Sequence, residues 1–137
     1  MRCSAYSGIL TVAVAAQVAL AGQPLPAAVA DAFACYTALP SQLVPVLQKI
    51  RSQESADAHA AELHTAINHI YTAREKLHHM PELTPAQNQQ VREQFGMQMR
   101  EEWARLYAEI TRLRQANCFK SVSLAREFRT MCMMIEK

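Results

Sequence analysis

Histidine side chains are the first candidates for chemistry in this sequence. His59, His64 and His69 are spaced by five residues. On a helix this spacing turns each side chain by about 140° from the previous one, so the three cannot share one metal ion. The better candidates for a copper or zinc site are three consecutive residues, His78, His79 and Met80. The alternative is that these histidines are solvated and interact favourably with the C-terminal end of a helix.

Sulfur is concentrated near the end of the chain, in residues 131–134 (Met-Cys-Met-Met). Soft sulfur ligands select copper(I). On a terminal amphipathic helix, however, methionine is more often a core residue that fills irregular space. We therefore interpret this segment as core and expect the protein to hold no cofactor.

One pair of carboxylates, Glu101 and Glu102, stands beside Trp103 and could be imagined as an acid and a base. Adjacent helical residues point about 100° apart, so a solvated charged face is the better interpretation. The sequence contains no glycine-rich phosphate loop, and no serine stands in a nucleophile elbow. We expect a protein that is not an enzyme.

The start of the chain has the order of a secretory signal peptide. Arg2 supplies one positive charge, residues 8–21 form an apolar run that only Gln17 interrupts, and Pro24 and Pro26 follow. The run is shorter than the roughly 20 residues that span a membrane. We predict a signal peptide over residues 1–21, with cleavage as late as residue 30, and a periplasmic or secreted protein. A retained anchor is the alternative.

Loss of the signal peptide would remove Cys3 and leave Cys35, Cys118 and Cys132 in an oxidising compartment, where a disulfide is expected. If the last helix folds back from a tight turn, Cys132 lies on the order of 15 Å from the turn that holds Cys118. We therefore expect Cys35 to be one partner of the disulfide. Its pairing with Cys118 is favoured, and pairing with Cys132 is the alternative.

The charge balance excludes one class of partner. Without Arg2, the 14 basic side chains of the chain become 13, against 12 acidic ones, and they alternate in sign along the later segments. A nucleic-acid-binding protein normally has a clustered basic face. We expect no nucleic acid as partner, and no strong membrane binding once the signal is removed.

The rest of the sequence predicts helices throughout. We treat residues 22–40 as an N-terminal linker segment and residues 41–137 as a helical domain. A short helix is expected from Pro40 or Ser41 to near Ser52. A long amphipathic helix should follow, with Ser55 as its N-cap and an end near His79.

The third helix has the clearest start. Thr84 is a good N-cap, Pro85 suits the first helical position, and Gln87 completes a capping box. This helix should run to about Asn117. The last helix should open at Ser121 or Ser123, because an apolar stripe follows from there, with Leu124, Phe128, Met131 and Ile135 at helical spacing.

These elements predict an all-α fold. The two long helices are joined by a short connection and should form an antiparallel hairpin. The shorter N-terminal and C-terminal helices should pack on the hairpin and cover its remaining apolar surface. The expected architecture is a small helix bundle.

Two resemblances arise from these residues. Residues 83–87 (Leu-Thr-Pro-Ala-Gln) resemble the Leu-Thr-x-x-Gln motif of the Spy and CpxP family of periplasmic helical chaperones and metal-stress proteins. Residues 54–63, with the proline-bearing turn and methionine-containing helix that follow, resemble small exported bacterial helical-hairpin proteins without assigned function. The first resemblance implies client binding, and the second implies no particular chemistry.

The leading hypothesis is an exported, non-catalytic helical protein that acts by protein interaction or self-association, for example as an envelope accessory. Its interface candidates are Tyr71, Trp103 and Tyr107, because amphipathic aromatic residues suit interfaces; buried core is the alternative for each. A Spy- or CpxP-like chaperone and a periplasmic metal binder are the other two hypotheses.

Overall fold

The structure, a computed structural model, describes residues 24–136. The expected signal peptide lies outside the described residues. Within residues 24–136 the chain forms α2 (Ala27–Lys49), α3 (Gln53–His78), α4 (Pro85–Gln115), the short 3₁₀ turn η1 (Asn117–Lys120) and α5 (Val122–Ile135), and it contains no strand. The all-α helix bundle predicted from the sequence is confirmed. None of the helices in this part of the chain is long and apolar enough to cross a membrane.

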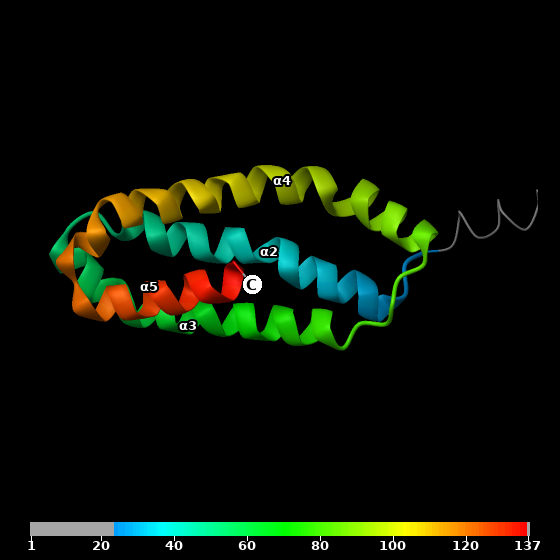
Figure 1. The fold of residues 1–137 in the computed structure, drawn as a ribbon, viewed down its shortest axis with the longest axis horizontal. Coiled ribbons are helices and arrows are strands. Elements are labelled where there is room, and N and C mark those ends of the chain that lie inside the picture. The colour runs from blue at the N-terminus through cyan, green and yellow to red at the C-terminus, as the bar shows by residue number, and fades with distance from the viewer. Residues whose placement is uncertain (1–23, 137) are drawn as a thin grey trace, which may run out of the picture.

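The four helices lie along one long axis (Figure 1). Each helix runs opposite to the one before it, so the two longest helices, α3 and α4, are antiparallel. α2 packs against both of them, and α5 packs against α3. α5 stops about midway along the bundle, so one end contains all four helices and the other end is built by α2, α3 and α4. The two ends therefore differ in how well their apolar residues are covered.

The first helix is longer than the sequence analysis expected. α2 begins at Ala27, so most of the expected linker over residues 22–40 is helical and belongs to the bundle. Val29, Ala32 and Leu39 in this part are buried. Pro40 and Pro45 lie inside the helix. Each proline removes one helical hydrogen bond, but the alanine-rich sequence and the buried face keep the helix continuous through both.

The helix starts are set by local hydrogen bonds. α4 has the expected capping box, in which Thr84 Oγ1 accepts from the Gln87 backbone N–H at 3.2 Å and Gln87 Oε1 accepts from that of Thr84 at 2.9 Å. α3 begins earlier than expected, because Ser52 is its N-cap and Ser55 is the reciprocal partner three residues later. At the start of α5, Ser121 is the N-cap.

The core has two parts. A main cluster runs along the bundle and takes residues from all four helices, including Leu43, Leu63, Leu106 and Met131. A second set, here called the end cluster, lies where α5 is absent, and its buried members are Val29, Val91 and Phe95. Its partly buried members are Leu25, Phe33, Met80 and Leu83.

The connection between α4 and α5 has an unusual backbone. All four residues of η1 have positive φ, with values of 47° at Asn117, 46° at Cys118, 51° at Phe119 and 62° at Lys120, and none of them is glycine. The turn is therefore a short piece of left-handed helix, which L-residues seldom adopt. It places Cys118 in the main cluster and directs α5 back along α3.

Candidate functional site

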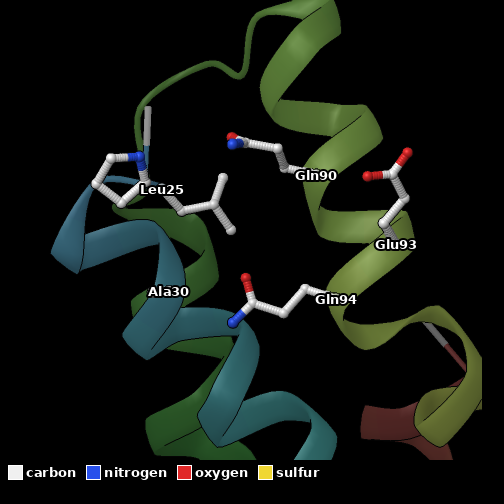
Figure 2. A pocket seen from close by; sticks show the side chains of 6 residues that line it. Leu25, Ala30, Gln90, Glu93 and Gln94 are labelled. Carbon is white, nitrogen blue, oxygen red and sulfur yellow. The ribbon is translucent and has the colours of Figure 1, made fainter. Parts of the chain in front are cut away.

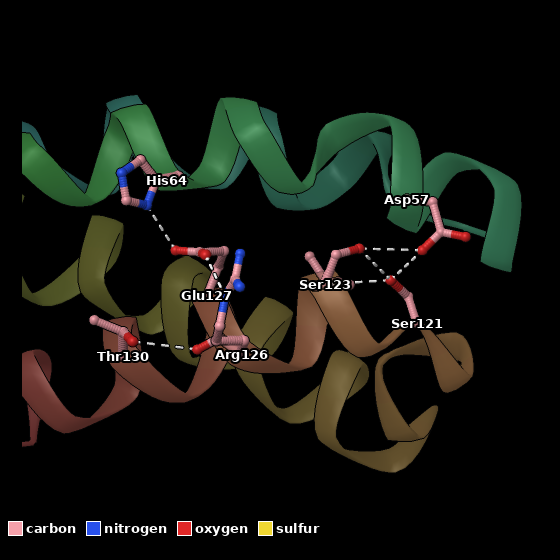
Figure 3. A network of polar contacts seen from close by, with 8 residues as sticks. Asp57, His64, Ser121, Ser123, Arg126, Glu127 and Thr130 are labelled. Atoms are coloured by element: carbon pink, nitrogen blue, oxygen red, sulfur yellow. Dashed lines mark hydrogen bonds and ion pairs between the residues drawn. The ribbon is translucent and has the colours of Figure 1, made fainter.

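The richest set of polar side chains lies in a groove between α3 and α5 (Figure 3). The groove has a volume of about 660 Å³, and its floor includes Ala60 and Ala61 of α3. Asp57 and His64 extend from α3, and Arg126 and Glu127 from α5. Two carboxylates, an imidazole and a guanidinium thus line one groove. Carboxylates and imidazoles are the side chains that most often carry out acid–base catalysis, so the groove is a candidate catalytic site.

One end of the groove is a serine–aspartate cluster. Asp57 Oδ1 accepts hydrogen bonds from the hydroxyl groups of Ser121, at 2.5 Å, and Ser123, at 3.2 Å (Figure 3). Ser121 is 2% exposed, and its oxygen also accepts from the Leu124 backbone N–H at 3.1 Å. The hydroxyl therefore caps α5 and ties the start of that helix to α3.

The other end of the groove is a buried carboxylate. Glu127 is buried, and its Oε2 accepts from His64 Nδ1 at 2.8 Å while its Oε1 accepts from Arg126 Nε at 3.0 Å. The hydrogen bond from His64, helped by that from Arg126, lowers the pKa of Glu127 from its usual 4.5 and outweighs the opposing effect of burial. Since an ionised carboxylate can only accept, Nδ1 of His64 is the protonated nitrogen.

The two ends of the groove remain separate. A histidine held by a carboxylate resembles the base half of a nucleophile–base pair, but the serine hydroxyls contact Asp57. Within residues 24–136, His64 has no hydrogen bond to a serine, threonine or cysteine. The contact that activates a nucleophile is therefore not assembled in this geometry. These contacts instead hold α5 against α3 at both ends of the groove.

A second concave site lies at the end cluster, between the start of α2 and the first turns of α4 (Figure 2). It has a volume of about 480 Å³. On one side Pro24, Leu25 and Ala30 form an apolar wall, and on the other Gln90, Glu93 and Gln94 present amide and carboxylate groups. The Leu25 side chain points across the pocket toward α4. The site combines one apolar wall with one polar wall.

The three aromatic interface candidates have different surroundings. Tyr71 on α3 and Tyr107 on α4 are exposed, at 54% and 47%. Trp103 is only 8% exposed and belongs to the main cluster, so for this residue the core interpretation is correct. Its ring stacks on Tyr36 of α2 at 4.9 Å and lies 6.0 Å from that of Tyr107. Burial, and to a lesser extent Tyr107, raises the pKa of Tyr36.

The metal candidates lie at the end of α3. The rings of His78 and His79 are 5.4 Å apart in an edge-to-face arrangement, and His79 Nε2 is 3.2 Å from Glu75 Oε2. Met80 packs against the end cluster. In the part of the chain that the structure describes, no group of three or more His, Cys, Asp and Glu side chains could hold a metal ion. The three residues therefore remain a prediction from the sequence.

The cysteines are grouped differently from the expectation. Cys35, Cys118 and Cys132 are all free thiols in the structure. Cys35 Sγ accepts from Lys76 Nζ at 3.2 Å, at the contact of α2 with α3. Cys118 and Cys132 instead line one pocket of about 400 Å³.

Burial raises the pKa of both thiols in that pocket. Cys132 raises the pKa of Cys118 further, while Arg114 opposes the rise at Cys132. Cys118 thus shares a pocket with Cys132, whereas Cys35 contacts Lys76. A tight turn was expected from the sequence, but the left-handed backbone at Cys118 was not foreseen.

Sequence reasoning missed Asp57, Ser121 and Glu127 as partners. No local pattern identifies the partners of Asp57, because the two serines lie 64 and 66 residues further along the chain. One signal was available: Glu127 stands directly beside Phe128 on the apolar stripe of α5. A carboxylate at such a position needs a partner, although the sequence does not identify it.

Comparisons with known proteins add no relative. No protein-family model, no curated protein and no solved structure matches this chain significantly.

Proposed function

We propose that this protein is an exported, non-catalytic helical protein that binds another protein through the end cluster. The signal-like start of the sequence supports export to the periplasm or beyond. The polar groove between α3 and α5 supports a structural role for its histidine and carboxylates, because each finds its partner within the groove. The surface at the end cluster then supports binding of another protein as the activity of the bundle.

The observation that carries this proposal is the incomplete cover of the end cluster. α5 contributes Leu124, Phe128 and Met131 to the main cluster, whereas the end cluster lies beyond the point at which α5 stops (Figure 1). Its members Leu25, Phe33, Met80 and Leu83 stay partly exposed. A concave, partly apolar surface rimmed by polar groups is a typical protein-binding site.

The partner that fits this surface best is an amphipathic helix. Its apolar face would contact the Leu25 side of the pocket, and its polar face would meet Gln94 and Glu93 on α4 (Figure 2). Recognition of a helix in a groove is a common mode of binding.

Site-specific photo-crosslinking in the native cell tests the proposal. A photoreactive amino acid replaces Gln94 at the pocket, and in a matched control it replaces Val122, which is 85% exposed but lies at the four-helix end. We expect a discrete crosslinked protein of reproducible mass from position 94 and none from position 122. Equal crosslinking from both positions, or none from position 94 in exported protein, contradicts the proposal.

Two further measurements separate this proposal from the other hypotheses. A Spy- or CpxP-like chaperone would slow the aggregation of unrelated unfolded proteins at near-stoichiometric amounts. A metal binder using His78, His79 and Met80 would release heat on titration with zinc or with copper(I). We expect neither response above background, and a clear positive result in either assay would replace the proposed function.

A further inference from the structure

A small groove between α2 and α4 is lined by a glutamate that has one carboxylate oxygen without a donor among the described residues. Pro40, Ser41, Val44 and Pro45 line it from α2, and Glu102 and Arg105 line it from α4, around a volume of about 200 Å³. Glu102 Oε1 accepts from Gln98 Nε2 at 3.3 Å. Its Oε2 is buried and meets no hydrogen-bond donor among residues 24–136. A buried carboxylate oxygen without a donor is costly, and a donor bound at the groove would relieve that cost.

The prolines of α2 add further acceptors. Because Pro45 has no N–H, the carbonyl oxygen of Ser41 has no donor of the usual α-helical kind. Pro40 has the same effect on the carbonyl of Tyr36. Ser41 itself lines the groove. The groove therefore combines a carboxylate oxygen with a residue whose carbonyl has lost its helical partner.

The other walls are apolar. Pro40, Val44 and Pro45 present hydrocarbon to the groove and contribute no side-chain hydrogen-bonding group. A ligand that suits both features has a cationic head with several N–H donors and a short hydrocarbon stem. An ammonium group has three donors and no acceptor, and alkyl stems of this kind pack readily on apolar surface.

We propose that this groove is a binding site for a primary alkylammonium group, with Glu102 as its counter-ion. The group could come from a free amine or from a lysine side chain of another protein, since the chemistry is the same. The site lies on the contact between α2 and α4 and uses no residue of the end cluster. Its success or failure is therefore independent of the proposed function.

Arg105 makes the proposal sharper. It stands three residues after Glu102 on α4, is exposed, and lines the same groove. Its guanidinium is the positively charged group among the residues that line the groove. Its charge therefore opposes the binding of an ammonium group. Removing its charge should strengthen binding, whereas removing the charge of Glu102 should weaken it. Opposite signs alone would also follow from general surface electrostatics, so the comparison that identifies the site is Glu102→Gln against Glu101→Gln, which remove the same charge from neighbouring positions.

The test is a titration of the chain, as purified from its host cell, with n-butylammonium, followed by chemical shifts of the amides in α2 and α4. We expect saturable binding with a dissociation constant on the order of a millimolar, as befits so small a ligand. 1-Butanol, which has the same stem without the charge, should not bind at that concentration. The absence of saturable binding in both the wild type and Arg105→Gln overturns the proposal.

Three variants give the specificity. Glu102→Gln should weaken butylammonium binding roughly tenfold or more, as expected for loss of a charged hydrogen bond. Arg105→Gln should strengthen it. Glu101→Gln is the matched control, because Glu101 carries the same charge on an exposed position next door. Equal weakening by Glu101→Gln and Glu102→Gln refutes the assignment. Circular dichroism confirms that each variant is folded, and the gain in Arg105→Gln does not depend on Glu102→Gln folding.

The source of the ammonium group is decided by two further ligands. Nα-acetyl-lysine amide carries the group on a peptide-like backbone, and Nα-acetyl-norleucine amide is its uncharged counterpart. If the lysine derivative binds at least as tightly as butylammonium and the norleucine derivative does not, the site accepts a lysine of a partner. If butylammonium binds and the lysine derivative does not, the site takes a free amine. Binding of the norleucine derivative as tight as that of the lysine derivative overturns the role of the charge.

Discussion

Replacing Lys120 by glycine should make this protein more stable, although glycine is usually destabilising. Lys120 is exposed, its φ is 62°, and it makes no ion pair within residues 24–136. A left-handed conformation costs a residue with a Cβ atom about 1–2 kcal/mol, a cost that glycine does not have. Cys118 and Phe119 share this conformation but contact the main cluster, so truncating either would also remove core contacts.

The size of the gain follows from two opposing effects. Removing the strain of the left-handed conformation raises the free energy of unfolding by about 1–2 kcal/mol. The greater conformational freedom of glycine in the unfolded chain lowers it by about 0.4–1 kcal/mol. The net increase in the free energy of unfolding should be about 0.5–1 kcal/mol, or roughly 3 °C in Tm for a domain of this size. Asn117→Gly should gain less, because asparagine tolerates the left-handed region better than lysine.

Urea denaturation followed by circular dichroism measures this change. The midpoint should rise for Lys120→Gly while the slope stays the same, which indicates a change in stability alone. Ala104→Gly is the control, since Ala104 is exposed inside α4 and its replacement should cost about 1 kcal/mol. If both glycine variants were destabilised by the same amount, η1 would not be left-handed in solution and the reasoning would be refuted.

Two further predictions concern interactions between helices. Arg112 donates from Nη2 to the carbonyl of Leu47 at 2.8 Å and from Nη1 to that of Ile50 at 2.9 Å. Arg112→Met should therefore lower the free energy of unfolding by about 2 kcal/mol. Arg114→Met, at an exposed position, should lower it less, and equal losses from the two variants would contradict this assignment. The pKa of Glu127 is lower in the folded chain than its usual 4.5, so this carboxylate stabilises the fold above about pH 4.5, and the contribution is lost as the pH falls through the folded-state pKa. Urea midpoints at neutral pH and at about pH 3 should therefore differ less in Glu127→Gln than in the wild type, and an unchanged difference would show that Glu127 is not the group responsible.

Local features of the fold were predictable because their causes lie within a few residues. The capping box of Thr84 and Gln87 needs only three residues and a proline between them, and it forms as expected. The start of α3 was predicted at Ser55, but in the structure the cap is Ser52, three residues earlier, and Ser55 is its reciprocal partner. The presence of each helix could thus be predicted from the sequence, whereas its exact first and last residues were predicted less accurately.

The beginning of α2 shows where sequence rules fail. Residues 22–40 were expected to be a linker, and Pro24, Pro26 and Pro40 in this segment are unfavourable inside helices. Burial of Val29, Ala32 and Leu39 against other helices outweighs that local cost. Tertiary contact decides such positions, and a single sequence does not display it.

The candidate sites depend even more on distant partners. The contacts of Glu127 with His64 and of Asp57 with Ser121 join residues more than 60 positions apart. The groove around Glu102 requires α2 to lie on α4, although the two helices are separated by all of α3. Glu102 was considered from the sequence but interpreted as part of a solvated face, because nothing local indicates that one of its oxygens is buried.

Arg112 also bears on the order in which the chain can fold. The carbonyl groups of Leu47 and Ile50, at the end of α2, both accept from Arg112 of α4, more than 60 positions later, and the Leu47 carbonyl also accepts from the Ile50 backbone N–H at 3.2 Å. The corner between α2 and α3 is therefore unfinished until α4 has docked. A fragment that ends after α3 would contain every residue of this corner and still leave the Ile50 carbonyl to water, while the Leu47 carbonyl would keep only its bond from the Ile50 backbone N–H. Formation of the corner between α2 and α3 and the packing of α4 should consequently occur in one cooperative folding step.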